Sequence, residues 1–295
     1  MSESSAADSL TDPAFIQRLE SLFLLARRVL GGTLQADRKS RKKGTGITFA
    51  DYAEYRLGDD YRAIDWRVFA RFDQLVIKLF ELEEDATIYL LCDASPSMEN
   101  KLTIARQLTA ALGYIGLQCM DRVAIYSLAD HLQCIQEVGR GKGKVFSMLR
   151  SLEELTPFGS DTDFTACTKE FQARHRKKGV VIAISDFLFP SGFENGLKRL
   201  SGLGHDVFAI QVQDPADQVC DWKGDVEIQC SETNARERLT ITRREVEAYE
   251  TAIQNWNENL AKECARRGIG LATTSIEDEF DAVIQGILRR GGLVA

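Results

Sequence analysis

Proline, histidine and tryptophan are scarce in this sequence of 295 residues, which contains 5 Pro, 3 His and 3 Trp. With 22 Gly and a hydrophobic share of 44%, the chain is neither collagen-like, nor of low complexity, nor globally disordered. The longest uncharged stretch of helical character, 107–120, is too short to span a bilayer. The polar, acidic start differs from the basic and apolar parts of a secretory signal peptide. We therefore expect a folded cytoplasmic protein without a transmembrane segment.

Paired cysteine motifs are also missing. The seven cysteines are scattered without a C-x-x-C pair, and an odd number cannot all pair within one chain. Reduced thiols in a cytosolic protein fit this pattern best.

Positive charge is in deficit overall, and the formal net charge of −7 argues against wholesale nucleic-acid binding. The deficit is uneven: residues 38–80 carry 10 Lys and Arg against 6 Asp and Glu, whereas residues 81–295 carry 24 against 33. The basic segment begins with a run of five cations, Arg38, Lys39, Arg41, Lys42 and Lys43. Such a run is usually a solvated arm without a specific partner. The functional alternative is that it contacts an acidic partner surface or an anionic polymer.

The length allows about two domains, or one large α/β domain with an appendage. We predict a flexible tail over 1–13 and an N-terminal extension over 14–83, which contains an amphipathic helix at 14–30 followed by the basic segment. From residue 84 to 295, predicted strands alternate with helices. Two of these strands, 87–92 and 180–185, are continuously apolar, as expected for strands buried on both faces of a parallel sheet. The pattern predicts an α/β fold with a mostly parallel central sheet and helices on both faces.

Polar side chains follow both apolar strands. Asp93, Ser95 and Ser97 come directly after the first strand, Asp186 follows the second, and a loop between them holds Ser160 to Asp163. In open parallel sheets, function collects at the carboxyl ends of strands, where the strand order reverses. We therefore expect these three segments to meet at one edge.

Two carboxylates and three hydroxyls, from Ser95, Ser97 and Thr162, offer only oxygen ligands. Such donors suit hard cations and disfavour zinc. Mg²⁺ fits better than Ca²⁺, and Mn²⁺ or Ca²⁺ are the alternatives. A bound ion with few charged ligands keeps net positive character and attracts an anionic oxygen from outside.

These segments resemble the metal-ion-dependent adhesion site of von Willebrand factor A domains. More specifically, the stretch from Gly44 to Arg71 together with the D-A-S-P-S-M loop resembles the bacterial family called domain of unknown function fifty-eight, over nearly the whole chain. The resemblance implies a Rossmann-like von Willebrand A fold. It also implies a MoxR-type AAA+ ATPase as a partner, acting with this protein in chaperone-like assembly of an unidentified client.

The resemblance assigns the metal site residue by residue to Asp93, Ser95, Ser97, Thr162 and Asp186. The family's usual Gly-Gly-Thr is Ser160-Asp161-Thr162 here, so that Asp161, together with Asp163, adds a carboxylate near the ion. The hypothesis is a non-enzymatic, Mg²⁺-dependent protein interaction module.

Three alternatives compete with this hypothesis. Ser97 could cap a helix beginning near Glu99 and bind no ion. A Mg²⁺-dependent phosphohydrolase also places Asp at a strand end, although Ser95 stands where a second aspartate is expected in the haloacid dehalogenase arrangement. A binder of anionic polymers through the 38–43 arm is the third.

Overall fold

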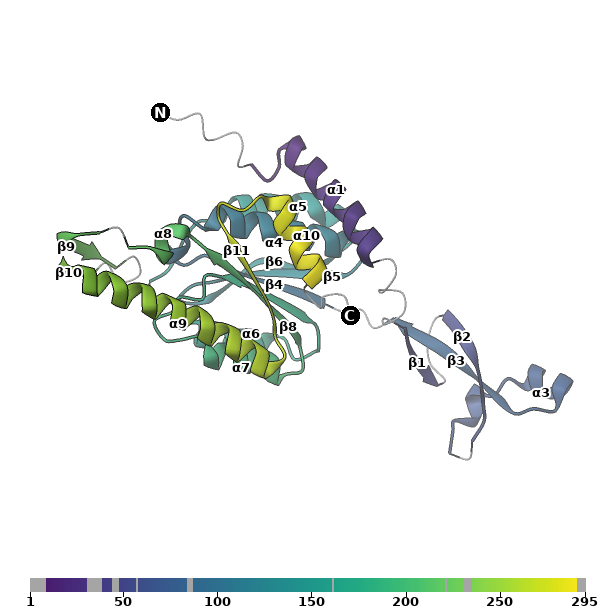
Figure 1. Cartoon of the computed structure of the whole chain (residues 1–295). Coiled ribbons are helices and arrows are strands. Elements are labelled where there is room, and N and C mark those ends of the chain that lie inside the picture. Colours follow the sequence, from purple (N-terminus) through teal and green to yellow (C-terminus); the bar gives the residue numbers. More distant parts are fainter. Residues whose placement is uncertain are drawn as a thin grey trace. The chain divides into compact units, whose positions relative to one another are not determined.

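The computed structural model describes residues 9–30, 39–43, 48–56, 58–83, 87–160, 162–220, 222–230 and 235–290. Their contacts form two compact units. The first holds the described residues up to 27 and from 87 to 290, and the second holds those from 28 to 83 (Figure 1). In chain order, the second unit is thus inserted into the first.

A six-stranded sheet forms the centre of the first unit, with the strand order β11-β8-β7-β4-β5-β6. All neighbours pair in parallel except β5 and β6, which are antiparallel. The strands are β4 (Thr87–Asp93), β5 (Arg122–Leu128), β6 (Leu132–Arg140), β7 (Val180–Ser185), β8 (Asp206–Gln213) and β11 (Gly270–Ser275). The two apolar strands predicted from the sequence, β4 and β7, lie side by side in the middle, where both faces are covered. The expectation of a mostly parallel α/β sheet is confirmed.

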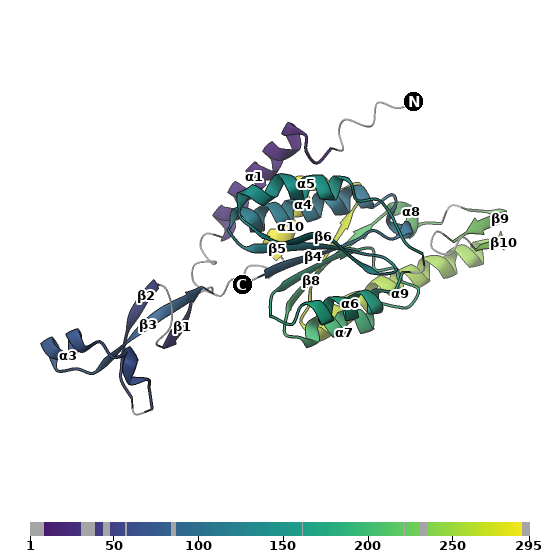
Figure 2. The same cartoon turned by 180° about the vertical axis from the view of Figure 1, so that it is seen from behind.

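Helices cover both faces of this sheet (Figures 1 and 2). One face carries α1 (Pro13–Leu30), α4 (Leu102–Gln118), α5 (Val145–Glu153) and α10 (Phe280–Arg290). The other carries α6 (Phe164–Arg174), α7 (Glu194–Gly202) and α9 (Arg243–Arg267). Shorter elements are η2 (Pro96–Met98), η3 (Lys142–Lys144), α8 (Pro215–Gln218) and the hairpin of β9 (Gly224–Gln229) and β10 (Arg236–Ile241). Within the described residues, no helix has the length and apolar character needed to cross a membrane.

The packing of α6 against α7 depends on a glycine. Gly196 of α7 faces the ring of Phe164, and a Cβ at Gly196 would lie 2.2 Å from the ring atom Cδ1. Phe164 in turn stacks on Phe189 at 4.8 Å between ring centroids, and both rings are buried. Because helices approach this closely only where one surface is small, Gly196 positions α6, which directly follows the loop of Thr162.

The helix α1 belongs to the first unit up to residue 27, which differs from the predicted grouping of 14–83. The ring of Phe15 lies 5.6 Å from that of Phe280 in α10, and Phe23 lies 6.4 Å from Tyr114 in α4. Because the apolar face of α1 is buried against these helices, α1 packs as part of the first unit and does not belong to the same unit as the basic segment. The predicted flexible tail over 1–13 also changes at its end: Leu10 is buried, and Thr11 donates a hydrogen bond to Glu153 at 3.0 Å.

The second unit is a three-stranded antiparallel sheet in the order β1-β3-β2. Its elements are β1 (Lys39–Lys43), β2 (Thr48–Glu54), η1 (Tyr61–Ala63), α3 (Trp66–Phe72) and β3 (Val76–Glu83). Asp65 caps α3 by accepting a hydrogen bond from the Arg67 amide at 3.0 Å, and it also accepts one from the Tyr52 hydroxyl at 3.0 Å. Trp66 and Phe72 remain exposed on α3. This unit therefore combines an antiparallel sheet with short helices.

Candidate metal centre

The strand order reverses between β4 and β7. From β4 the chain builds outward to β5 and β6, then returns to the other side of β4 to add β7, β8 and finally β11. Asp93 is the last residue of β4, and Asp186 directly follows β7. The structure thus brings these two carboxylates to the carboxyl edge of the sheet at its switch point, where a binding site is expected.

Asp93 is completely buried. Its Oδ1 accepts a hydrogen bond from the Ser95 amide at 2.9 Å, and its Oδ2 accepts one from the Ser185 hydroxyl at 2.5 Å. Burial and, after it, the negative charge of Asp186 raise the pKa of Asp93 to about 7. The same carboxylate repulsion that raises this pKa would be relieved by a cation between the two groups.

The two serines of the D-x-S-x-S motif face one another, with 3.0 Å between Ser95 Oγ and Ser97 Oγ. Ser95 precedes η2 without making a side-chain cap, and Ser97 lies inside η2. The N-cap of the following helix α4 is Lys101. The alternative that Ser97 caps this helix is therefore wrong, because the chain inserts a 3₁₀ turn before α4 begins.

The loop of residues 158–163 begins beside Asp93. The Phe158 amide donates a hydrogen bond to the Ala94 carbonyl at 2.9 Å, and Thr162 is buried directly before the N-cap of α6. Asp163 caps α6, since its Oδ1 accepts a hydrogen bond from the Ala166 amide at 3.0 Å. This capping role explains Asp163 without an ion. The predicted contribution of Asp161 lies outside the described residues.

The two oxygens of Asp186 have different partners. Its Oδ1 accepts a hydrogen bond from the Leu188 amide at 2.9 Å. Its Oδ2 is buried and forms a close ion pair with the ammonium of Lys101, at 2.6 Å. A buried carboxylate oxygen that already faces a cation is also a suitable ligand for a divalent ion.

Lys101 is the residue at this site that our sequence interpretation missed. Its ammonium is buried, and it also donates a hydrogen bond to Asp217 Oδ2 of α8 at 2.6 Å. The signal in the sequence was a lysine four residues beyond Ser97, but exposed lysines at such positions are common. Its partner Asp217 could not be identified because it lies 116 positions away.

The donor set fits a hard divalent cation. Two carboxylates, two hydroxyls in mutual contact and a buried threonine supply oxygen only. Across the described chain, no group of three or more His, Cys, Asp and Glu side chains is arranged to hold a metal. A site of this composition would therefore rely on neutral hydroxyls and water for its remaining ligands.

The cysteines near this edge are poor nucleophiles. Burial raises the pKa of the Cys92 thiol to about 12 and that of the Cys167 thiol to about 12 as well. Among the described histidines, His131 follows β5 on the same edge, where its Nδ1 lies 2.6 Å from Asp130 Oδ1. Both members of this pair are exposed to solvent. These groups do not assemble a nucleophile with its base.

The predicted basic arm remains unassigned. Arg38 lies outside the described residues, and Lys39, Arg41, Lys42 and Lys43 are described only through the backbone of β1.

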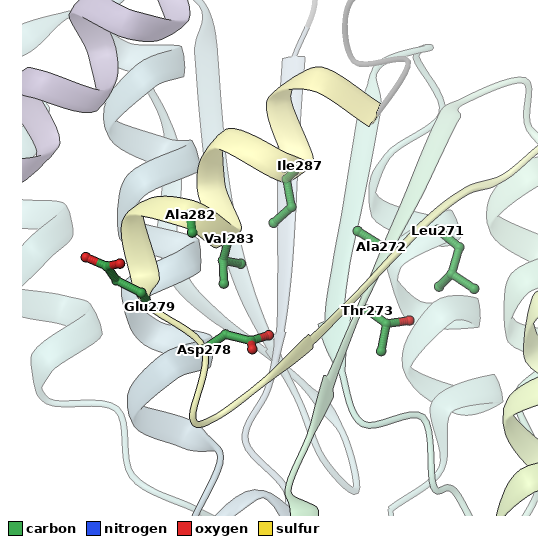
Figure 3. Close-up of a pocket in the computed structure, with 9 residues that line it drawn as sticks. Leu271, Ala272, Thr273, Asp278, Glu279, Ala282, Val283 and Ile287 are labelled. Atoms are coloured by element: carbon green, nitrogen blue, oxygen red, sulfur yellow. The ribbon is translucent and has the colours of Figure 1, made fainter.

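A groove of about 460 Å³ lies between β11 and α10 (Figure 3). It is lined by aliphatic side chains such as Leu271 and Ile287, with Asp278 and Glu279 at one end. Asp278 is engaged locally, because its Oδ2 accepts a hydrogen bond from the Ser275 amide at 2.7 Å. None of the predicted metal ligands lines this groove.

Comparisons with known proteins give the following matches. The family described as "Protein of unknown function DUF58" matches residues 51–259. A protein of Mycobacterium bovis, "Uncharacterized protein Mb1516", is 24% identical over 280 residues, which are 92% of this chain and 87% of that protein. Among solved structures, the conserved hypothetical protein BatB from Bacteroides thetaiotaomicron aligns over 70% of this chain and 97% of its own, with a TM-score of 0.47 and 16% identity. An aerotolerance-related membrane protein from Bacteroides fragilis aligns over 70% and 98%, with a TM-score of 0.43 and 15% identity.

Proposed function

Since this chain belongs to the family described as protein of unknown function DUF58, we propose its function from the chemistry of its own site. The proposal is a protein interaction module that binds Mg²⁺ through Asp93, Ser95, Ser97, Thr162 and Asp186. The bound ion then accepts a carboxylate from a partner protein.

The observation that carries this proposal is the pair of buried carboxylates, Asp93 and Asp186, that interact at the switch point of the sheet. The two aspartates repel one another. Both oxygens of Asp93 accept local hydrogen bonds, which fix the orientation of its carboxylate. A divalent ion would offset this repulsion while the hydroxyls of Ser95 and Ser97 complete an oxygen shell.

The residues of this chain would orient the ion and leave it electrophilic. Ser185 holds Asp93, and the Leu188 amide holds Asp186, so that neither carboxylate turns away from the site. Three of the five protein ligands are neutral, so the ion keeps affinity for one more anionic oxygen. A single ion–carboxylate contact sets specificity, whereas a stable complex also requires a broader interface of standard size.

A MoxR-type AAA+ ATPase is the partner that we propose from the family resemblance. The protein would act with this ATPase in chaperone-like assembly of a client, and it would itself have no catalytic activity. A metal-dependent phosphohydrolase remains the competing proposal. It requires turnover of a generic phosphoester that is abolished by Asp93→Asn, and a screen with such substrates tests it directly.

Isothermal titration of the full chain with Mg²⁺, Mn²⁺ and Ca²⁺ tests the metal site. We expect binding of one ion, lost in Asp93→Ala and in Asp186→Ala. Asp206→Ala is the matched control, because Asp206 is an exposed carboxylate at the start of β8. Absence of binding to the wild-type chain would contradict the proposal.

Co-purification with the ATPase tests the partner. We expect the complex to form in Mg²⁺ and to dissociate in EDTA or after Asp93→Ala, while Asp206→Ala retains it. A complex that is indifferent to both treatments would show that the interaction does not pass through the ion.

A further inference from the structure

The cation that neutralises Asp186 in this structure comes from the chain itself. Lys101 Nζ lies 2.6 Å from Asp186 Oδ2 and 2.6 Å from Asp217 Oδ2. Both Lys101 and Asp186 are only 3% exposed, whereas Asp217 is 36% exposed. The ammonium therefore bridges an inner carboxylate of the proposed metal site and an outer carboxylate on α8.

This position is unfavourable for an ammonium in two respects. Lys101 is the N-cap of α4, and the partial positive charge at a helix N-terminus repels a cation. Burial also lowers the pKa of Lys101, but Asp186 and Asp217 outweigh this effect, so that the pKa is raised overall. The lysine is thus held in place by the two carboxylates.

The two contacts of Lys101 differ in their surroundings. Asp186 is buried and belongs to the proposed metal site, whereas Asp217 is partly exposed on α8. A divalent ion bound at the site therefore competes with the ammonium for Asp186. After such an exchange, Asp217 would still retain the ammonium through its hydrogen bond of 2.6 Å.

We propose that Lys101 is a built-in counter-cation that competes with the divalent ion for Asp186 and withdraws to Asp217 when the ion binds. This inference rests on the proposed function, since it concerns regulation of the same site. The lysine sets the affinity of the site: it stabilises the ion-free state and weakens ion binding.

The outer partner connects this exchange to α8 and α9. The Asp217 carbonyl accepts a hydrogen bond from the Tyr249 hydroxyl of α9 at 2.8 Å. Asn257 of α9 accepts a hydrogen bond from Gln211 at 2.8 Å and donates one to Gln218 of α8 at 3.3 Å. Withdrawal of Lys101 therefore changes the charge balance at a carboxylate that is attached to both helices.

Two substitutions with opposite expected effects test this inference. Lys101→Gln removes the competitor, so we expect the Mg²⁺ affinity measured by titration calorimetry to rise by about tenfold. Asp217→Asn removes the outer acceptor and confines the ammonium to Asp186, so we expect the affinity to fall several-fold. Lys198→Gln on the exposed surface of α7 is the matched control, and its affinity should equal that of the wild type.

The outcomes separate this inference from the proposed function. If the wild type binds Mg²⁺ and Lys101→Gln binds no more tightly, or if both substitutions weaken binding, Lys101 is merely structural and the inference is overturned. If only Lys101→Gln binds, the inference stands and the proposed function of the native site fails. If neither protein binds, both fail. Thermal unfolding followed by circular dichroism establishes that each variant is folded, and Lys101→Arg, which keeps the charge, should not show the tightening.

Discussion

Ser185 donates its hydroxyl hydrogen to Asp93 Oδ2 over 2.5 Å, although the two residues lie 92 positions apart in the chain. The same hydroxyl oxygen accepts a hydrogen bond from the Phe187 amide at 2.8 Å. Phe187 has a positive φ of 59°, a backbone conformation that is unusual for a bulky residue. Ser185 therefore fixes both the aspartate of one strand and the turn that leads away from the next.

Replacement of Ser185 by alanine removes both hydrogen bonds and leaves a buried carboxylate oxygen unsatisfied. We expect Ser185→Ala to lower the free energy of unfolding by about 1–3 kcal/mol, as measured by urea denaturation. Ser147→Ala is the control, because that exposed hydroxyl donates only to the Lys144 carbonyl, and it should change stability by less than about 0.5 kcal/mol. Equal stability of the two variants would contradict the structural role of Ser185.

Replacement of Asp93 by asparagine should stabilise the ion-free protein. Burial and the charge of Asp186 disfavour the ionised Asp93 carboxylate, and the neutral amide avoids both penalties. We expect this relief to exceed the loss of the hydrogen bond from Ser185, which the amide NH₂ group cannot accept. At pH 8 in EDTA, we expect the free energy of unfolding of Asp93→Asn, measured by urea denaturation, to be about 1–2 kcal/mol higher than that of the wild type. Addition of Mg²⁺ should then raise the melting temperature of the wild type and leave that of Asp93→Asn unchanged. A variant that is less stable in EDTA would contradict this prediction, because the loss of the hydrogen bond from Ser185 would then outweigh the relief of burial and repulsion.

His175 and His205, which precede β7 and β8, should make the stability of the fold decrease in acid. Burial lowers the pKa of His175 and of His205 below 6.5. The unfolded chain therefore binds protons more readily than the folded chain, so this contribution to stability is present above pH 6.5 and is lost as the pH falls below it.

The test of this effect compares His175→Gln with the wild type by urea denaturation at pH 7.5 and pH 5.5. Asp93 also makes stability depend on pH, with the opposite sign, because its pKa is raised. Both proteins contain Asp93, so its contribution cancels when their free energies of unfolding are subtracted. We expect the stability deficit of His175→Gln to shrink at pH 5.5. A constant deficit at both pH values would rule out the histidine contribution.

Two glycines of the same helix should respond oppositely to alanine. A Cβ at Gly196 would lie 2.2 Å from Phe164, whereas nothing lies within 4 Å of one at Gly202. We expect Gly196→Ala to cost about 1–3 kcal/mol through overpacking, and Gly202→Ala to be neutral or stabilising by up to about 1 kcal/mol. Thermal and urea denaturation of both variants measure this contrast, and similar values for the two would refute the close α6–α7 approach.

The sequence was most informative where local pattern and burial agree. The apolar runs of β4 and β7 predicted doubly covered strands, and the positions of Asp93 and Asp186 after those runs placed both carboxylates at one edge of the sheet. Each of these inferences needed only a short stretch of sequence and the general behaviour of parallel sheets.

The parts that could not be predicted depend on contacts between distant segments. Nothing near Lys101 in the sequence indicates that Asp186 and Asp217 surround its ammonium. The sequence alone also left open whether Ser97 caps α4. The structure excludes this role, because the 3₁₀ turn η2 contains Ser97 and α4 begins only after Lys101. Long-range pairing and the placement of a helix start by one turn are both decided by the packed structure.

The insertion of the second unit between α1 and β4 has a consequence for biosynthesis. The apolar face of α1 leaves the ribosome first, but Phe280, which packs on Phe15, is made only after more than two hundred further residues. Until then only part of its final surroundings exists, namely α4, on which Phe23 packs through Tyr114. The apolar surface of Phe15 meanwhile stays exposed to solvent or to aggregation. Docking of α1 onto α10 is accordingly one of the last steps that the growing chain can complete, and the first unit reaches its full core only near the end of translation.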